Sequence, residues 1–206
     1  MDYLAIDSDY GTVSKVYKES GVVTSPMGCR AYLSPWKDPE TGQYVTVGRC
    51  NIGAVSLNLP LMWEVARYEH PENIEDAFYV LLDKNLEITR KFLKRRYETI
   101  ANVQCSTNPL AFTQGGLYKG FKSPEEKVGD LIQYMTASFG ITSLNELSEY
   151  AKGYGIHESN KFAKEVVQHI YDKVQQYKEE DGHLYALYGK KLPYWNYLTL
   201  LKGVKQ

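Results

Sequence analysis

Cysteine is scarce in this sequence, and every cysteine occurs singly. The 206 residues contain three cysteines, Cys29, Cys50 and Cys105, and no C-x-x-C pair. A tetrahedral zinc site cannot be built from three cysteines alone, so we expect no metal site of that kind in this chain. Free thiols are typical of a reducing compartment, which favours a cytoplasmic location.

Long apolar runs and an excess of charge are missing as well. No run approaches the roughly 20 apolar residues of a membrane span, and the acidic start "MDYLAIDSDYG" lacks the apolar core of a signal peptide. Lys+Arg number 24 and Asp+Glu 25, a net charge of -1, so the chain lacks the electrostatic footprint of a nucleic-acid-binding protein. The densest basic run, residues 89–98, follows a helical pattern. We interpret it as a solvated helix face, with a phosphate-facing patch as the alternative.

Aromatic residues are abundant instead. The chain has 18 tyrosines and three tryptophans, side chains that combine a large apolar area with a polar tip. They suit a core that borders a wet cavity or another subunit. A length of 206 residues corresponds to one domain or slightly more.

The hydrophobic pattern predicts strands joined by helices. Long helices are predicted over residues 72–102 and 158–181 from apolar residues that recur every three or four positions. Strand, helical crossover and strand in the last third indicate a βαβ unit, and therefore parallel pairing in an α/β fold. The other predicted elements are strands at 21–25, 44–51, 137–142 and 183–189, and helices that begin near Asn58, Ser123 and Ser143.

The stretch "SPMGCRAYLSPW", residues 25–36, places Cys29 on a loop between two prolines. One interpretation is a structural cysteine under the loop, and the other is a reactive sulfur at its tip. Gly28 permits an unusual backbone turn and the close approach of a ligand, and Arg30 adds positive charge. A polar nucleophile would need a histidine base, but no histidine lies near Cys29 in the sequence.

Four stretches together carry a family resemblance. "TSPMGCRAYLSPW", "VGRCNIGAVSLNLPLMW", "ASFGITSLNELSEYAKGYG" and "YKEEDGHLYALYGK" occur in this order. They resemble the barrel region of anaerobic (class III) ribonucleoside-triphosphate reductases, which are glycyl-radical enzymes. The resemblance implies a partial ten-stranded α/β barrel over residues 21–190, after a poorly matched segment (1–20) and before an atypical tail (191–206).

The resemblance gives Cys29 a role. In the family the cysteine of the Met-Gly-Cys-Arg box lies at the tip of a finger loop and becomes a thiyl radical, which abstracts the 3′ hydrogen of the substrate ribose. Carried onto this chain, that cysteine is Cys29, and Met27, Gly28 and Arg30 beside it are expected to border the substrate. A carrier of hydrogen atoms needs a shielded sulfur, which explains why no base stands nearby.

The second box supplies further candidates. The resemblance implies that Asn51 hydrogen-bonds near the ribose hydroxyls, whereas its sequence alone also fits a turn residue that ends a strand. Ser56 and Asn58 precede a helix, so they either border a bound anion or simply cap the helix. Cys50 and Cys105 are interpreted as structural. The Gly-rich stretch 112–121 lacks Walker spacing, and we interpret it as a connecting loop that borders the substrate channel.

The chain also departs from the family pattern. The resemblance implies a glycyl radical, a structural zinc site, and formate or a thiol system as reductant, but the sequence contains neither a four-cysteine zinc site nor a recognisable radical-glycine motif. We therefore expect a fragment that is inactive alone. Its expected partners are a ribonucleoside triphosphate, a radical-SAM activating enzyme, and a complementary reductase segment or a second copy; no membrane or nucleic acid is expected.

Two rival functions remain at this point. The chain could be a non-catalytic barrel remnant or interaction module that binds nucleotide weakly, or it could belong to another glycyl-radical enzyme such as a formate-lyase relative. The second rival fits less well, because those enzymes often place their reactive cysteine in a different local motif.

Overall fold

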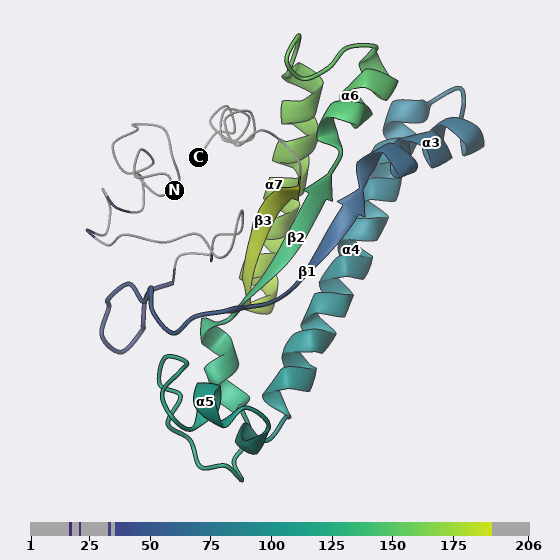
Figure 1. The fold of residues 1–206 in the computed structure, drawn as a ribbon. Coiled ribbons are helices and arrows are strands. Elements are labelled where there is room, and N and C mark those ends of the chain that lie inside the picture. The colour runs from purple at the N-terminus through teal and green to yellow at the C-terminus, as the bar shows by residue number, and fades with distance from the viewer. Residues whose placement is uncertain (1–16, 18–20, 22–32, 34–35, 191–206) are drawn as a thin grey trace. The chain divides into compact units, whose positions relative to one another are not determined.

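The computed structural model describes residues 17, 21, 33 and 36–190 (Figure 1). The finger-loop residues around Cys29, the predicted strand at 21–25 except Gly21, and the tail 191–206 lie outside the described residues. The chain divides into two compact units. Of the described residues, the first contains those up to 54, 92–138 and 181–186, and the second contains 55–91, 139–180 and 187–190.

A three-stranded parallel sheet forms the centre of the α/β fold. Its strands are β1 (Asn51–Asn58), β2 (Thr136–Thr142) and β3 (Leu184–Lys190), in the order β1-β2-β3. The three arrows point the same way in Figure 1, which confirms the predicted parallel pairing. Strand β2 is buried along almost its whole length, as expected for a central strand with packed groups on both faces.

The prediction of a strand at 44–51 was wrong for most of its length. Tyr44 forms only an isolated antiparallel bridge with Lys37, across a tight turn, and continuous pairing begins at Asn51. Gly48 interrupts the strand, because its backbone has φ 72° and its carbonyl accepts a hydrogen bond of 2.8 Å from the Tyr118 N–H. Packing against the 117–120 loop therefore delays the start of β1.

The predicted helices after Asn58, at 72–102, after Ser143 and at 158–181 are confirmed. They are α3 (Leu59–Glu69), α4 (Ile74–Ala101), α6 (Leu144–Lys152) and α7 (Lys161–Asp181). Asn58 caps α3 through its side chain, and Pro60 occupies the first turn, where a missing N–H costs nothing. The expected cap at Ser143 differs. Its backbone is left-handed, with φ 58°, and its side chain makes no capping hydrogen bond.

The helix predicted to begin at Ser123 was wrong. Glu126 accepts a hydrogen bond of 2.7 Å from the Ser123 N–H, as in a capping box, but the chain then pairs with another segment. Lys127 bridges to Gln104, and the Val128 N–H donates to the carbonyl of Val103 over 2.9 Å. Only a 3₁₀ helix, η2 (Gly129–Tyr134), follows. Earlier in the chain, the segment between α4 and Ser123 contains two short helices, η1 (Cys105–Thr107) and α5 (Pro109–Phe112).

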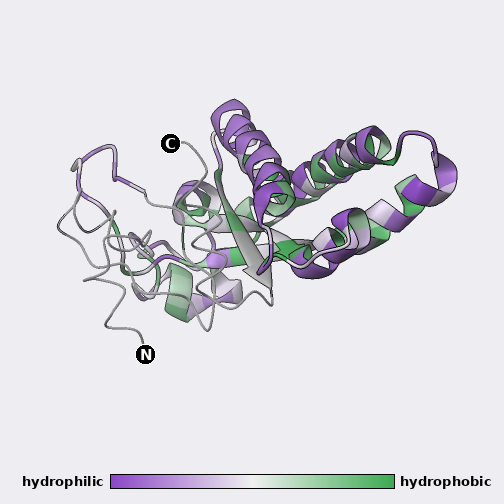
Figure 2. Cartoon of the chain, turned by 90° about the horizontal axis from the view of Figure 1, so that it is seen from above, coloured by the Kyte–Doolittle hydropathy of each residue, from purple (hydrophilic) through white to green (hydrophobic). Residues whose placement is uncertain are grey.

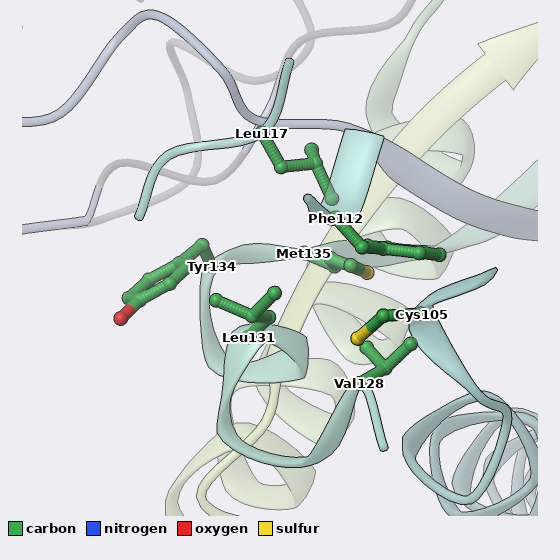
Figure 3. Packing of buried hydrophobic residues seen from close by; sticks show 7 residues of the cluster. All are labelled: Cys105, Phe112, Leu117, Val128, Leu131, Tyr134 and Met135. Carbon is green, nitrogen blue, oxygen red and sulfur yellow. The ribbon is translucent and has the colours of Figure 1, made fainter. Parts of the chain in front are cut away.

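Each unit has its own apolar core. In the first unit, seven buried residues from the segment between α4 and β2 form one cluster (Figure 3): Cys105, Phe112, Leu117, Val128, Leu131, Tyr134 and Met135. In the second unit, α3 and α6 pack together, and the Trp63 ring contacts Phe78 and Phe162, with centroids 5.5 and 5.8 Å away.

The long helices are amphipathic, with hydrophilic and hydrophobic residues alternating along them (Figure 2). The apolar face predicted for α7 is confirmed, since all its members are buried: Phe162, Val166, Ile170, Val174 and Tyr177. The apolar spacing of α4 predicts that six residues share one face: Phe78, Leu81, Leu82, Leu86, Leu93 and Tyr97. All of them are buried except Leu81, which is half-buried. In the described part of the chain, no helix combines the length and apolarity that a membrane crossing requires.

Candidate active site

The structure describes some of the predicted site residues. Met27, Gly28, Cys29 and Arg30 lie outside the described residues, so their predicted roles stay predictions. Asn51 opens β1 in the first unit, and Ser56 and Asn58 lie further along β1 in the second unit.

Asn51 is held by hydrogen bonds at both ends of its amide. Its Nδ2 donates to the hydroxyl oxygen of Ser138 on β2, and its Oδ1 accepts a hydrogen bond of 2.9 Å from the backbone N–H of Gly53. These contacts fix which amide atom is the donor and which the acceptor. Among the described residues, one Nδ2 hydrogen and one lone pair of Oδ1 have no further partner, so the amide can orient a hydroxyl group without adding charge.

Arg49 makes the corresponding contacts two residues earlier. Its Nε donates to the carbonyl of Tyr134 over 3.0 Å, and its Nη2 donates to the hydroxyl of Thr136 over 3.4 Å. The guanidinium is half-buried. Burial lowers the pKa of Arg49 to about 10, so the side chain stays positively charged at neutral pH.

The two pairs form a ladder of polar side chains between β2 and the segment that enters β1. Thr136 and Ser138 alternate with Ala137 along β2 and therefore point to the same face of the strand. Both hydroxyl-bearing residues are buried, with exposed fractions of 0% and 1%. Burying such groups is costly unless they are hydrogen-bonded, and Arg49 and Asn51 provide those bonds. We call Arg49, Asn51, Thr136 and Ser138 the polar ladder.

Sequence reasoning identified Asn51 but not its three companions in the polar ladder. Arg49 stands in the quoted "VGRCN" box, and Thr136 and Ser138 stand at alternate positions of the strand "TASFGIT". Polar residues at every second position of a buried strand were the available signal. The pairing itself joins residues about 87 positions apart, and no local pattern predicts such a contact.

The two described cysteines face apolar surroundings. Cys105 belongs to the buried cluster of Figure 3, and Cys50 packs against that cluster. Burial raises the pKa of both thiols, which disfavours the thiolate. These contacts agree with the structural interpretation of Cys50 and Cys105.

An aromatic group supports the sheet near the polar ladder, again in the first unit. The buried hydroxyl of Tyr97 on α4 donates toward the carbonyls of Met135 and Leu184, each at 2.9 Å. The His183 ring stacks on Tyr97 with centroids 4.1 Å apart. Burial raises the pKa of Tyr97 and lowers that of His183, so both rings are kept in their neutral forms.

The second unit contains the remaining predicted residues. Asn58 Oδ1 accepts a hydrogen bond of 3.2 Å from the Leu61 N–H at the start of α3, so its side chain is used as a helix cap. Ser56 is exposed. The contact with the Leu61 N–H supports the capping interpretation for Asn58 over an anion site.

Comparison with known proteins assigns the chain to a family. A family profile described as "Anaerobic ribonucleoside-triphosphate reductase" matches residues 4–190. The chain belongs to the anaerobic ribonucleoside-triphosphate reductase family. This confirms the resemblance inferred from the Met-Gly-Cys-Arg and Gly-Arg-x-Asn boxes, and it means that the polar ladder lies in a chain of the reductase family.

Individual relatives of the reductase family carry the same name. The chain is 29% identical over 180 residues to the "Anaerobic ribonucleoside-triphosphate reductase" of Salmonella typhimurium. This match covers 84% of this chain and 24% of the relative. The reductase of Escherichia coli is 28% identical over 180 residues, with the same coverage. That of Enterobacteria phage T4 is 29% identical over 181 residues, covering 85% of this chain and 28% of the relative. The chain thus spans about a quarter of the length of these relatives.

The polar ladder offers hydrogen-bonding groups rather than metal ligands. Across the residues that the structure describes, no three His, Cys, Asp or Glu side chains are placed to hold a metal ion. An amide, two hydroxyls and a guanidinium can bind and orient a polar ligand, but they do not supply a general base.

Proposed function

We propose that this chain contributes the substrate-facing part of an anaerobic ribonucleoside-triphosphate reductase, which converts ribonucleoside triphosphates to 2′-deoxyribonucleoside triphosphates by radical chemistry. The observation that carries the proposal is the fixed amide of Asn51, held by Ser138 and Gly53 in a chain that matches the reductase profile over residues 4–190. The three parallel strands would form part of a ten-stranded barrel.

In this proposal Cys29 is the hydrogen-atom carrier. Its sulfur-centred radical takes the 3′ hydrogen of the ribose, so that an S–H bond forms as the C3′–H bond breaks. The 2′ hydroxyl then takes up a proton and leaves as water, and formate or a thiol system supplies the two electrons and the proton for the new C2′–H bond. Cys29 finally returns its hydrogen atom to C3′, which restores the sulfur radical. Met27, Gly28 and Arg30 flank the sulfur in the sequence and would line its approach to the substrate.

Asn51 would orient a ribose hydroxyl through its remaining N–H and lone pair. A neutral amide that is already fixed loses little conformational freedom when the substrate binds, which is the advantage of a preorganised site. Ser138 acts through Asn51 and is a positioning residue. Ser56 would lie at the edge of the bound substrate, and Asn58 serves mainly as a helix cap.

Other polypeptides would supply the parts of the reaction that this sequence lacks. A glycyl radical, produced by a radical-SAM activating enzyme, would generate the radical at Cys29. A complementary reductase segment would supply that glycine and the structural zinc site, because this sequence contains neither motif.

A chimeric enzyme tests the proposal. Residues 4–190 replace the matching stretch of the Escherichia coli relative, and the chimera is activated without oxygen and assayed for deoxynucleotide formation. We expect turnover in the chimera, none in Cys29→Ala, and near-normal turnover in Cys50→Ala, a matched cysteine that packs against the core. Electron paramagnetic resonance checks that each protein acquires its glycyl radical.

Two results would contradict the proposal. One is turnover by Cys29→Ala, which removes the role of that sulfur. The other is a folded chimera that carries the glycyl radical but forms no deoxynucleotide, which would favour a non-catalytic barrel remnant. Ser138→Ala is expected to lower kcat more than it raises KM, because positioning of Asn51 matters most in the transition state.

A further inference from the structure

Arg49 is a half-buried cation whose partners among the described residues are all neutral. Its guanidinium donates to the Tyr134 carbonyl and the Thr136 hydroxyl, and among the described residues no carboxylate lies within ion-pair distance of it. Other partly buried cations of the chain are neutralised directly. Lys119 pairs with Glu40 at 2.6 Å, and Arg90 pairs with Glu180 at 2.8 Å.

The unused hydrogen-bonding capacity of Arg49 is substantial. A guanidinium has five N–H donors in a planar fork. The two contacts described above employ Nε and one hydrogen of Nη2, so within the described part of the chain the second hydrogen of Nη2 and both hydrogens of Nη1 have no partner. A partly desolvated charge with free donors is costly unless an anion compensates it, so this group favours an anionic ligand.

The contacts of Arg49 also fix where such a ligand would bind. The Tyr134 carbonyl ends η2, and together with the Thr136 hydroxyl it holds the guanidinium in one orientation. Asn51 lies two residues after Arg49, at the first position of β1, and is held by the next hydroxyl of β2, that of Ser138. The cation and the amide are therefore presented by adjacent positions of the polar ladder.

We infer that Arg49 and Asn51 form an oxyanion-binding subsite, in which the guanidinium fork takes two oxygens of a carboxylate or phosphate group while the amide binds a neighbouring polar atom. Bidentate contacts of this kind are stronger and more specific than contacts between neutral groups. The subsite extends the proposed function, on which it rests only for the identity of the atom at Asn51. Binding of the oxyanion itself requires no turnover, so it can be measured separately.

The experiment uses the full 206-residue chain, labelled with nitrogen-15, at constant ionic strength. Sodium formate, inorganic tripolyphosphate and CTP are titrated in separate arms, while nuclear magnetic resonance follows the Nε–H of Arg49 and calorimetry gives the affinity. We expect the Arg49 resonance to shift with saturation in at least one arm. We expect Arg49→Gln to weaken that binding by about tenfold or more, as for loss of a charge-assisted hydrogen bond.

The matched control is Arg95→Gln, which removes the same charge from an exposed arginine of α4 in the same unit. It should change the affinity less than about twofold, as expected for a screened surface charge. Saturation only by tripolyphosphate and CTP identifies the group as phosphate, and saturation only by formate identifies it as a carboxylate.

The inference is overturned if the Arg49 resonance stays in place in all three arms, a result that needs no variant to fold. It is also overturned if Arg49→Gln binds the same anion as tightly as the unmodified chain does. Either result would leave the turnover of the chimera untouched, so a failure of the subsite is distinguishable from a failure of the proposed function.

Discussion

The hydroxyl of Tyr97 can be removed by a substitution that keeps its ring, so its contribution to stability can be measured directly. It is buried, and it lies 2.9 Å from the carbonyls of both Met135 and Leu184. Tyr97→Phe keeps the ring and its stacking on His183 and removes only this donor. A net hydrogen bond contributes about 1 kcal/mol, and a buried acceptor left without a partner costs about 1–3 kcal/mol. We therefore expect a loss of about 1–2 kcal/mol in the free energy of unfolding.

Urea unfolding followed by circular dichroism measures this loss. With a slope of roughly 2 kcal/mol per molar urea, the midpoint should fall by roughly 0.5–1 M. Tyr68→Phe is the matched control, because Tyr68 is 87% exposed and its hydroxyl is solvated in both states. A Tyr97→Phe midpoint equal to that of Tyr68→Phe would refute the reasoning, since the hydroxyl would then contribute nothing beyond its hydration.

Two further predictions concern capping and alkaline pH. Asn58→Ala removes the side chain that accepts from the Leu61 N–H and should lower the free energy of unfolding by about 1 kcal/mol. Asn58→Asp keeps a capping oxygen and should retain most of that stability. Equal urea midpoints for the two variants would contradict this prediction. Burial raises the pKa of Tyr79 and Tyr177 to about 12 in the folded chain, whereas a tyrosine of the unfolded chain has a pKa of about 10. Between these values the unfolded chain loses phenol protons that the folded chain keeps. The free energy of unfolding should therefore fall between about pH 10 and 12. A urea midpoint that holds constant from pH 9 to 11.5 would show that these phenols ionise equally in both states.

The long helices and two of the strands could be predicted because their signals are local. In α7 the spacing of Phe162, Val166 and Ile170 already defines the face that becomes buried. The strand "ASFGIT" is apolar and short, and β2 begins only one residue earlier than predicted. Where the backbone follows the preference of its own residues, periodicity is sufficient.

The failures occur where a distant segment competes with the local preference. Ser123 and Glu126 provide a helix start signal and do contact each other, but pairing of Lys127 with Gln104 determines the backbone that follows. Gly48 likewise takes a left-handed turn that packs on Tyr118. Neither partner can be recognised from the residues nearby.

The candidate site shows the same division. Asn51 could be named from the box in which it stands, because the motif is contiguous. Ser138, which fixes its amide, stands in another quoted stretch with no sign of the contact. The charge of Arg49 was visible, but its lack of an acidic partner among the described residues depends on the folded arrangement.

The polar ladder has a consequence for folding fidelity. Side chains in a strand alternate between faces, so a slip of one residue in the pairing of β1 with β2 turns every side chain to the opposite face. Such a slip would separate Asn51 from Ser138 and Arg49 from Thr136, and would leave two buried hydroxyls and a cation without their hydrogen bonds. The polar ladder thus also favours the correct strand register, because a mispaired sheet loses hydrogen bonds that stabilise it and the geometry of the candidate site together.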